Sequence, residues 1–66
     1  MIKTVNNHFK NEWLTLYKGK GYFYFIFDNG TDYECHSVYV NNFRDYTIER
    51  WIDIGQTFLN SINRSL

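Results

Sequence analysis

The fold of this chain is decided by an unbroken run of large apolar and aromatic side chains, Tyr22-Phe23-Tyr24-Phe25-Ile26-Phe27. The run is too short for a typical helix, and glycine and other turn residues bound it on both sides, as they bound β-strands. Alternate side chains of a strand point to opposite faces of its sheet, and a half-buried strand alternates apolar with polar residues. Here both faces are apolar. The run therefore predicts the central strand of a small sheet.

Two further segments predict neighbouring strands, over residues 13–17 and 32–40, because side chains of different character alternate in both. The connection before the central run contains Gly19 and Gly21, which tolerate positive φ, and the Asn29-Gly30 pair after it favours a type I′ turn. We expect an antiparallel β-meander over residues 12–40. In the simplest register Tyr17 lies opposite Tyr22, and Phe27 lies opposite Asp32.

A change of period after residue 42 predicts a helix over residues 47–63. Its apolar positions recur at the spacing of an amphipathic helix: Ile48, Trp51, Ile52, Gly55, Phe58, Leu59 and Ile62. Thr47 is a suitable N-cap, and Gly55 would let the helix approach the sheet closely. In residues 1–11, Ile2, Val5 and Phe9 recur near helical spacing, but Asn6 and Asn7 are poor helix formers. This segment therefore predicts either a short helix or a loose arm. The expected fold is α+β: a three-stranded antiparallel β-meander with a C-terminal helix on one face (β-β-β-α), in a single small domain over residues 1–66.

Strand alternation assigns the two faces of this sheet. The face expected to carry the helix consists of Leu14, Leu16, Phe23, Phe25, Phe27, Val38 and Val40. The other face also carries Ile26 and Cys35, and its aromatic residues are the expected partner-binding set: Trp13, Tyr17, Tyr22, Tyr24, Tyr33 and Tyr39. One helix cannot cover both faces, and exposed aromatic patches usually mark interaction sites. Alternatively, residues 1–11 fold over this face, or the tyrosines stand half-exposed with their hydroxyl groups in water.

Length and composition limit the classes of function. The chain has 66 residues, no net charge, one cysteine, and six Tyr, six Phe and two Trp residues. So short a domain buries only about 60% of its unfolded surface, so self-association into a homo-oligomer is an option. A single cysteine and no recognisable signal peptide predict a cytoplasmic protein. No apolar run approaches the roughly 20 residues of a membrane span, so no membrane partner is expected. The heavy use of residues with A/T-rich codons would fit a viral protein acting in the host cytoplasm.

No pattern for catalysis stands out. Cys35 and His36 are adjacent, so in a strand they point to opposite faces and cannot act as a nucleophile and its base. The order of Asp28, Asp32 and Glu34 does not match a calcium loop. The sequence therefore predicts no enzyme, no metal site and no cofactor.

One motif offers an alternative function. The segment Lys20-Gly21-Tyr22-Phe23-Tyr24-Phe25-Ile26-Phe27 is similar to the RNP1 motif of RNA-binding sheets and to the Lys-Gly-Tyr-Gly-Phe-Ile motif of cold-shock domains. The resemblance implies stacking of single-stranded bases on Tyr22, Tyr24 and Trp13, with Lys18 and Lys20 of the turn near the phosphates. The sequence departs from it at Phe23, where the motif has a small residue, and in its neutral charge. The leading expectation is a non-enzymatic protein-binding module, such as a viral accessory protein or inhibitor, that binds a host protein or a second copy of itself.

Overall fold

The computed structural model describes residues 1–65, and it confirms the expected β-β-β-α fold with a short helix added at the N-terminus. The elements follow in the order α1 (Ile2–Phe9), η1 (Lys10–Glu12), β1 (Leu14–Lys18), β2 (Phe23–Asp28), β3 (Tyr33–Val38), η2 (Phe43–Asp45) and α2 (Ile48–Ser65). The strands form one antiparallel sheet in the order β1-β2-β3, with the aromatic run at its centre.

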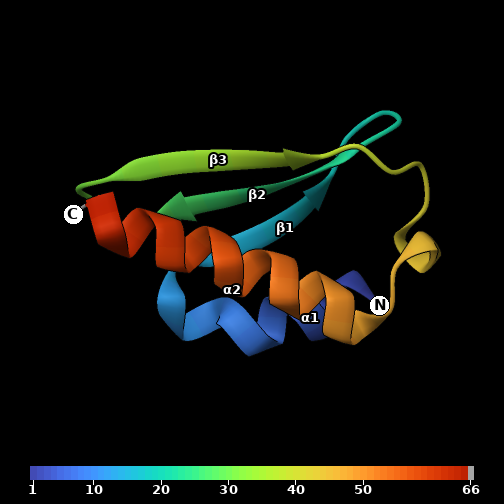
Figure 1. Cartoon of the computed structure of the whole chain (residues 1–66), viewed down its shortest axis with the longest axis horizontal. Helices are drawn as coiled ribbons and strands as arrows, with labels where there is room; N and C mark the ends of the chain where they lie inside the picture. Colours follow the sequence, from blue (N-terminus) through green and yellow to red (C-terminus); the bar gives the residue numbers. More distant parts are fainter. Residues whose placement is uncertain (66) are drawn as a thin grey trace.

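The molecule has two layers, with both helices beneath the same face of the sheet (Figure 1). Helix α1 packs against β1 and α2, and α2 lies alongside it. Residues 1–11 therefore do not fold over the opposite face, which was one alternative left open by the sequence. Within residues 1–65, the opposite face carries no covering element (Figure 1).

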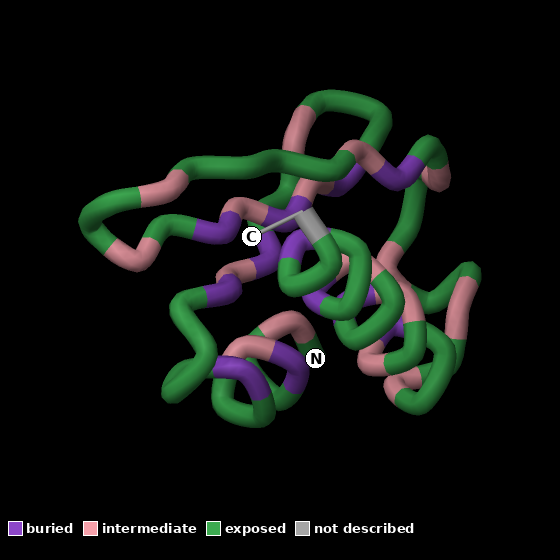
Figure 2. The backbone as a smooth tube through the Cα atoms, turned by 60° about the vertical axis from the view of Figure 1, so that its left-hand side comes forward, coloured by how far each residue is buried: buried purple, intermediate pink, exposed green. Residues whose placement is uncertain are grey.

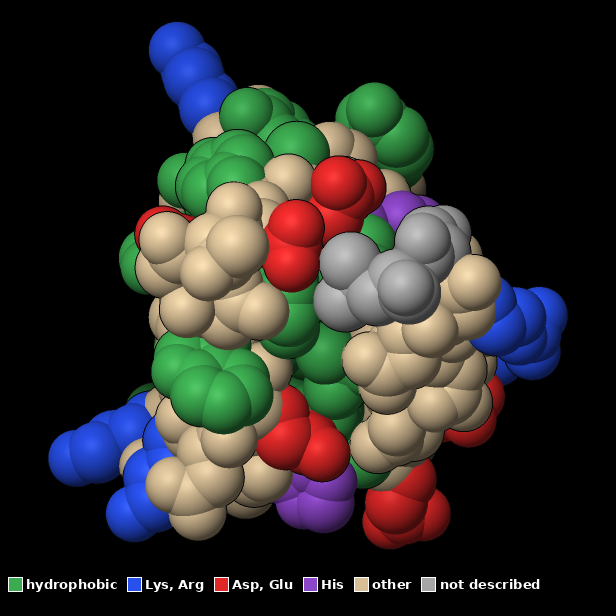
Figure 3. All heavy atoms as spheres, turned by 90° about the vertical axis from the view of Figure 1, so that its left-hand side faces the viewer, with side chains coloured by type: hydrophobic (Ala, Val, Ile, Leu, Met, Phe, Trp, Pro, Cys, Tyr) green, Lys and Arg blue, Asp and Glu red, His purple; other side chains and the backbone are tan. Residues whose placement is uncertain are grey.

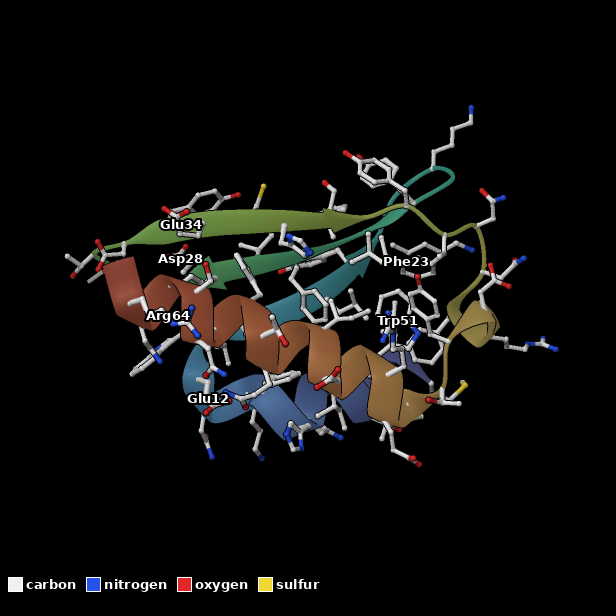
Figure 4. All side chains as sticks on the ribbon, viewed as in Figure 1. Glu12, Phe23, Asp28, Glu34, Trp51 and Arg64 are labelled. Carbon is white, nitrogen blue, oxygen red and sulfur yellow. The ribbon has the colours of Figure 1, made fainter. Side chains whose placement is uncertain are left out.

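The core lies between the sheet and the helices. Burial alternates along β1 and β2 but is almost absent along β3, as the colouring of Figure 2 shows. Phe23 and Trp51 point toward one another across the layers, with ring centroids 5.1 Å apart (Figure 4). The indole nitrogen of Trp51 donates a hydrogen bond to the Phe43 carbonyl oxygen at 2.8 Å, so the largest buried side chain has its one polar atom satisfied. The buried set is Val5, Phe9, Leu14, Leu16, Phe23, Phe25, Phe27, Val38, Trp51, Leu59 and Ile62.

Gly55 makes the close contact that its place in the apolar stripe predicts. A Cβ atom at this position would lie 2.6 Å from Phe9 Cε2 and 3.2 Å from Phe25 Cε1. The main contact is therefore with a ring of α1, and the sheet is its second neighbour. Thr47 acts as expected at the N-terminus of α2, where its hydroxyl oxygen accepts a hydrogen bond from Arg50 N–H at 3.1 Å. Helix α2 ends at Ser65, two residues beyond the predicted end at residue 63.

Both predicted registers are wrong by two residues. Tyr17 pairs with Tyr24 and not with Tyr22, and Ile26 pairs with Cys35. In the first turn, Gly19 N–H donates to the Tyr22 carbonyl oxygen at 2.8 Å, so Tyr22 belongs to the turn and β2 begins at Phe23. Side chains alternate with period two, so a slip of two residues leaves every strand residue on its predicted face. Leu14, Leu16, Phe23, Phe25, Phe27 and Val38 are all buried.

The predicted type I′ turn at Asn29-Gly30 is also wrong. Such a turn needs positive φ at both central residues, whereas Gly30 has a φ of +89° and Asn29 is not among the positive-φ residues of the described chain. Asn29 instead flanks the turn. Its N–H donates to the Asp32 carbonyl oxygen, and its side-chain oxygen accepts from Thr31 N–H and Asp32 N–H at 2.9 and 2.7 Å. The Asn29 side chain therefore stabilises the turn by accepting backbone hydrogen bonds, a role that the usual preference of Asn-Gly for type I′ turns does not predict.

Candidate binding surface on the open face and edge of the sheet

Four of the six predicted binding residues meet at one end of the open face. Tyr17, Tyr22, Tyr24 and Tyr39 are hereafter the tyrosine cluster. Tyr17 stacks on Tyr24 at 5.4 Å between ring centroids, Tyr22 lies 5.8 Å from Tyr24, and Tyr39 lies 6.3 Å from Tyr22. Tyr24 is half-buried between its neighbours, and the other three are exposed, with Tyr39 at 83%. The rings form one continuous aromatic surface.

Local backbone geometry positions this cluster. The observed register places Tyr17 directly opposite Tyr24, which brings their side chains onto the same face at contact distance. Gly19 lies beneath the Tyr22 ring, where a Cβ atom would be 2.6 Å from Tyr22 Cζ. Gly21 supplies the positive φ, +82°, that turns the chain into β2. The turn thus holds Tyr22 against the sheet, although Tyr22 lies outside the strand.

The remaining two predicted residues lie apart from the cluster. Tyr33 is 61% exposed at the far end of β3, opposite Asp28. Trp13 is 60% exposed and has left-handed backbone geometry, with a φ of 57°, at the end of η1. Because it precedes β1, strand alternation does not place it. It borders a hollow whose other walls include Phe27 and Leu59, at the helix side of the sheet.

The two lysines of the nucleic-acid alternative do not accompany the tyrosines equally. Lys20 is exposed in the β1–β2 turn, next to Tyr22. Lys18 shares the face of Leu14 and Leu16 by alternation and lines a hollow with Ile2 and Phe23 on the helix side. The opposite end of the molecule, with the β2–β3 turn, displays Asp and Glu side chains (Figure 3). A continuous basic track beside the tyrosine cluster is therefore not formed by Lys18 and Lys20.

The two edges of the sheet differ in a way that the sequence did not reveal. At β1, the Asn6 side-chain nitrogen donates to the Leu16 carbonyl oxygen at 3.1 Å, and Leu16 N–H donates to Asn6 Oδ1 at 2.6 Å. The amide of Asn6 thereby acts as a substitute strand residue on this edge. In the sequence, Asn6 and Asn7 indicate only an interruption of the N-terminal helix, and nothing local points to a contact with β1.

Strand β3 forms the other edge and is open to solvent. Its residues 33–36 are exposed, and its pairing with β2 runs from Tyr33 to Val38 without a bulge. Cys35 lies on the open face opposite Ile26, whereas His36 lies on the helix side opposite Phe25, so the two side chains are separated as expected. His36 stacks on Phe58 of α2, with 5.3 Å between ring centroids.

Among residues 1–65, no three His, Cys, Asp or Glu side chains lie close enough together to hold a metal ion. Neither described helix combines the length and apolar character needed to cross a membrane. Comparison of the chain with models of known protein families, with curated proteins and with solved structures finds no match.

Proposed function

We propose that this chain is a small non-enzymatic protein-binding module that docks the tyrosine cluster on a partner protein. The single observation that carries the proposal is the placement of both helices beneath one face, which leaves a stacked group of tyrosines on the other. Tyrosine provides a large rigid contact area together with a polar tip, and it is enriched among the residues that dominate binding energies.

The arrangement of the rings supports a binding role in a second way. Ordering a free side chain at an interface costs about 0.5–1.5 kcal/mol for rotamer-rich side chains, and pre-ordered contact surfaces avoid part of this cost. Tyr24 is held between Tyr17 and Tyr22, and the Tyr22 ring lies over Gly19. Tyr24 and Tyr22, at the centre of the cluster, are thus held in place before a partner binds. The use of residues with A/T-rich codons supports a viral origin and a host protein as the partner.

The test compares two alanine variants at opposite ends of the open face. Immobilised wild-type chain captures a partner from an extract of the host cell, and the captured protein is then titrated against Tyr24→Ala and Tyr33→Ala. Truncation of a central aromatic contact typically costs about 2 kcal/mol or more, which is roughly thirtyfold in affinity. We expect Tyr24→Ala to lose binding while its circular dichroism spectrum at the assay temperature remains that of the folded chain. Its unfolding midpoint is expected to fall, because the contacts with Tyr17 and Tyr22 are lost, but to stay above the assay temperature. Equal binding by wild type and Tyr24→Ala would overturn the proposal.

A random single-stranded oligonucleotide serves as the competing ligand in the same assay. Base stacking on the tyrosines would give binding that weakens steeply with salt and depends on Lys20. Under the present proposal the oligonucleotide produces no gel shift at physiological salt. A salt-dependent shift abolished by both Lys20→Ala and Tyr24→Ala would replace protein binding with nucleic-acid binding as the function of this surface.

A further inference from the structure

We propose that two copies of this chain pair through their β3 strands, antiparallel and centred on Cys35, to form one continuous six-stranded sheet. The inference rests on the unequal edges of the sheet and is independent of the tyrosine cluster. Exposed edge strands pair readily with other strands unless charged side chains (above all lysine), proline, a bulge or a covering element prevents it. Asn6 and α1 cover β1, whereas β3 has no lysine or proline between Tyr33 and Val38 and keeps a regular register. The one charged residue of β3, Glu34, finds a polar partner in the register argued below.

The backbone groups available for pairing follow from the hydrogen bonds of the sheet. In an antiparallel sheet, the N–H and C=O of one residue point to the same side, and the side alternates along the strand. Asn29 N–H donates to the Asp32 carbonyl oxygen across the turn, and the Leu16 backbone groups point outward to Asn6. Both observations place the backbone groups of Glu34, His36 and Val38 toward β2. Those of Tyr33, Cys35 and Ser37 therefore point outward.

Side-chain pairing selects one register for these outward groups. If Cys35 faces Cys35 of the second copy, then Tyr33 faces Ser37, and all three outward residues of each strand find partners. Glu34 then faces His36 of the second copy on both sides of the symmetry axis, on the helix side of the sheet. A shift of the second strand by two residues in one direction brings Glu34 opposite Glu34. The same shift in the other direction brings His36 opposite His36. Either slip also leaves one outward residue unpaired in each strand, so the centred register is preferred.

The centred register also explains two features that stand apart in a single copy. Ser37 lies opposite Tyr24 within one chain, so Tyr33 of the second copy extends the row formed by Ser37, Tyr24 and Tyr17. The isolated, 61% exposed ring of Tyr33 thereby lies over a small side chain, one strand away from Tyr24 of the other copy's tyrosine cluster. On the helix side, half-buried Ile54 and Phe58 line a hollow beside His36, with Arg50 and Asp53 at its rim. Pairing at β3 brings the two hollows toward one another across the seam.

The first test uses proline at an outward position. Sedimentation velocity of the full chain in reducing buffer, over a range of concentrations, is expected to show a reversible dimer. Cys35→Pro removes an N–H that has no partner in one chain, and edge strands tolerate proline at such positions. Loss of the two reciprocal Cys35 bonds is expected to raise the dimer Kd about thirtyfold, while the circular dichroism spectrum stays close to wild type. A wild type that stays monomeric at millimolar concentration, or a Cys35→Pro variant that still dimerises as wild type does, overturns the proposal.

A charge exchange tests the register and does not depend on the folding of the proline variant. Glu34→Lys places lysine opposite His36, and His36→Glu places two carboxylates opposite one another. Because each pair occurs twice in the dimer, each single change is expected to raise the dimer Kd about five- to tenfold at low salt. The double variant Glu34→Lys/His36→Glu places lysine opposite glutamate and is expected to recover most of the wild-type Kd. Additive weakening in the double variant would overturn the register.

Discussion

Replacement of Gly55 by alanine tests whether packing or helix propensity controls α2. Gly55 lies in the interior of the helix, where alanine is normally more favourable than glycine by about 1 kcal/mol. The methyl group would meet the Phe9 ring at 2.6 and 2.7 Å, whereas carbon atoms in ordinary contact are separated by about 3.5–4.0 Å. Phe9 is fully buried and makes an edge-to-face contact with Phe25, so any movement of its ring disturbs other core contacts.

The two effects have opposite signs, and their sizes decide the outcome. Overpacking a close-packed core usually costs about 1–3 kcal/mol, and an overlap of this size with a buried ring belongs in the upper part of that range. After subtraction of the propensity gain, we expect Gly55→Ala to lower the free energy of unfolding by about 1–2 kcal/mol. A domain of this length has a total of roughly 3–10 kcal/mol, so the loss is readily measured.

Urea denaturation followed by circular dichroism provides the measurement, with Thr57→Ala as the matched control. Thr57 is exposed on the same helix, so alanine there is expected to raise stability by about 0.5 kcal/mol through propensity alone. In a Phe9→Leu background, which removes the ring atoms in the contact, Gly55→Ala is expected to cost less than in wild type. If Gly55→Ala instead stabilises the wild type by about 1 kcal/mol, as at an open helix position, the packing argument is refuted.

Two further predictions concern side-chain hydrogen bonds to backbone groups. Asn6→Ala leaves both backbone groups of Leu16 without their side-chain partner, so we expect the free energy of unfolding to fall by about 1–3 kcal/mol in urea denaturation. Asn6→Asp keeps the acceptor but turns an anionic oxygen toward the Leu16 carbonyl, so a variant as stable as wild type would contradict the assigned geometry. Thr47→Ala removes the cap of Arg50 N–H and is expected to cost about 1 kcal/mol in thermal or urea unfolding, whereas Thr47→Ser should cost much less.

The faces of the sheet could be predicted from sequence because they depend only on the parity of each residue in its strand. Leu14, Leu16 and Phe25 are buried, and Tyr17 and Tyr24 share the open face. The register could not be predicted, because the hydrophobic pattern is unchanged by a slip of two residues. It is set by turn details, namely the ring of Tyr22 over Gly19 and the side chain of Asn29 within its hairpin.

The residues of the candidate surface could be predicted only in part, because residue parity gives the face but not the neighbours on it. Tyr17, Tyr22, Tyr24 and Tyr39 meet as a group, but Tyr33 and Trp13 do not join them within one chain. Trp13 follows a 3₁₀ turn and has positive φ, so the period of two that governs strand residues does not reach it. Proximity along a face depends on register and backbone bends, which are not local properties of the sequence.

The sequence by itself determined the type and order of the three strands and α2 and the face to which each strand residue belongs, since the periods of two and 3.6 are local properties of the chain. Only the tertiary structure decided which face of the sheet would receive α1. Its two buried residues, Val5 and Phe9, fit between β1 and α2, where Gly55 leaves room for the Phe9 ring and Asn6 reaches the Leu16 backbone. These contacts join residues distant in sequence. They cover one edge and one face of the sheet, and they leave the tyrosine cluster and β3 exposed.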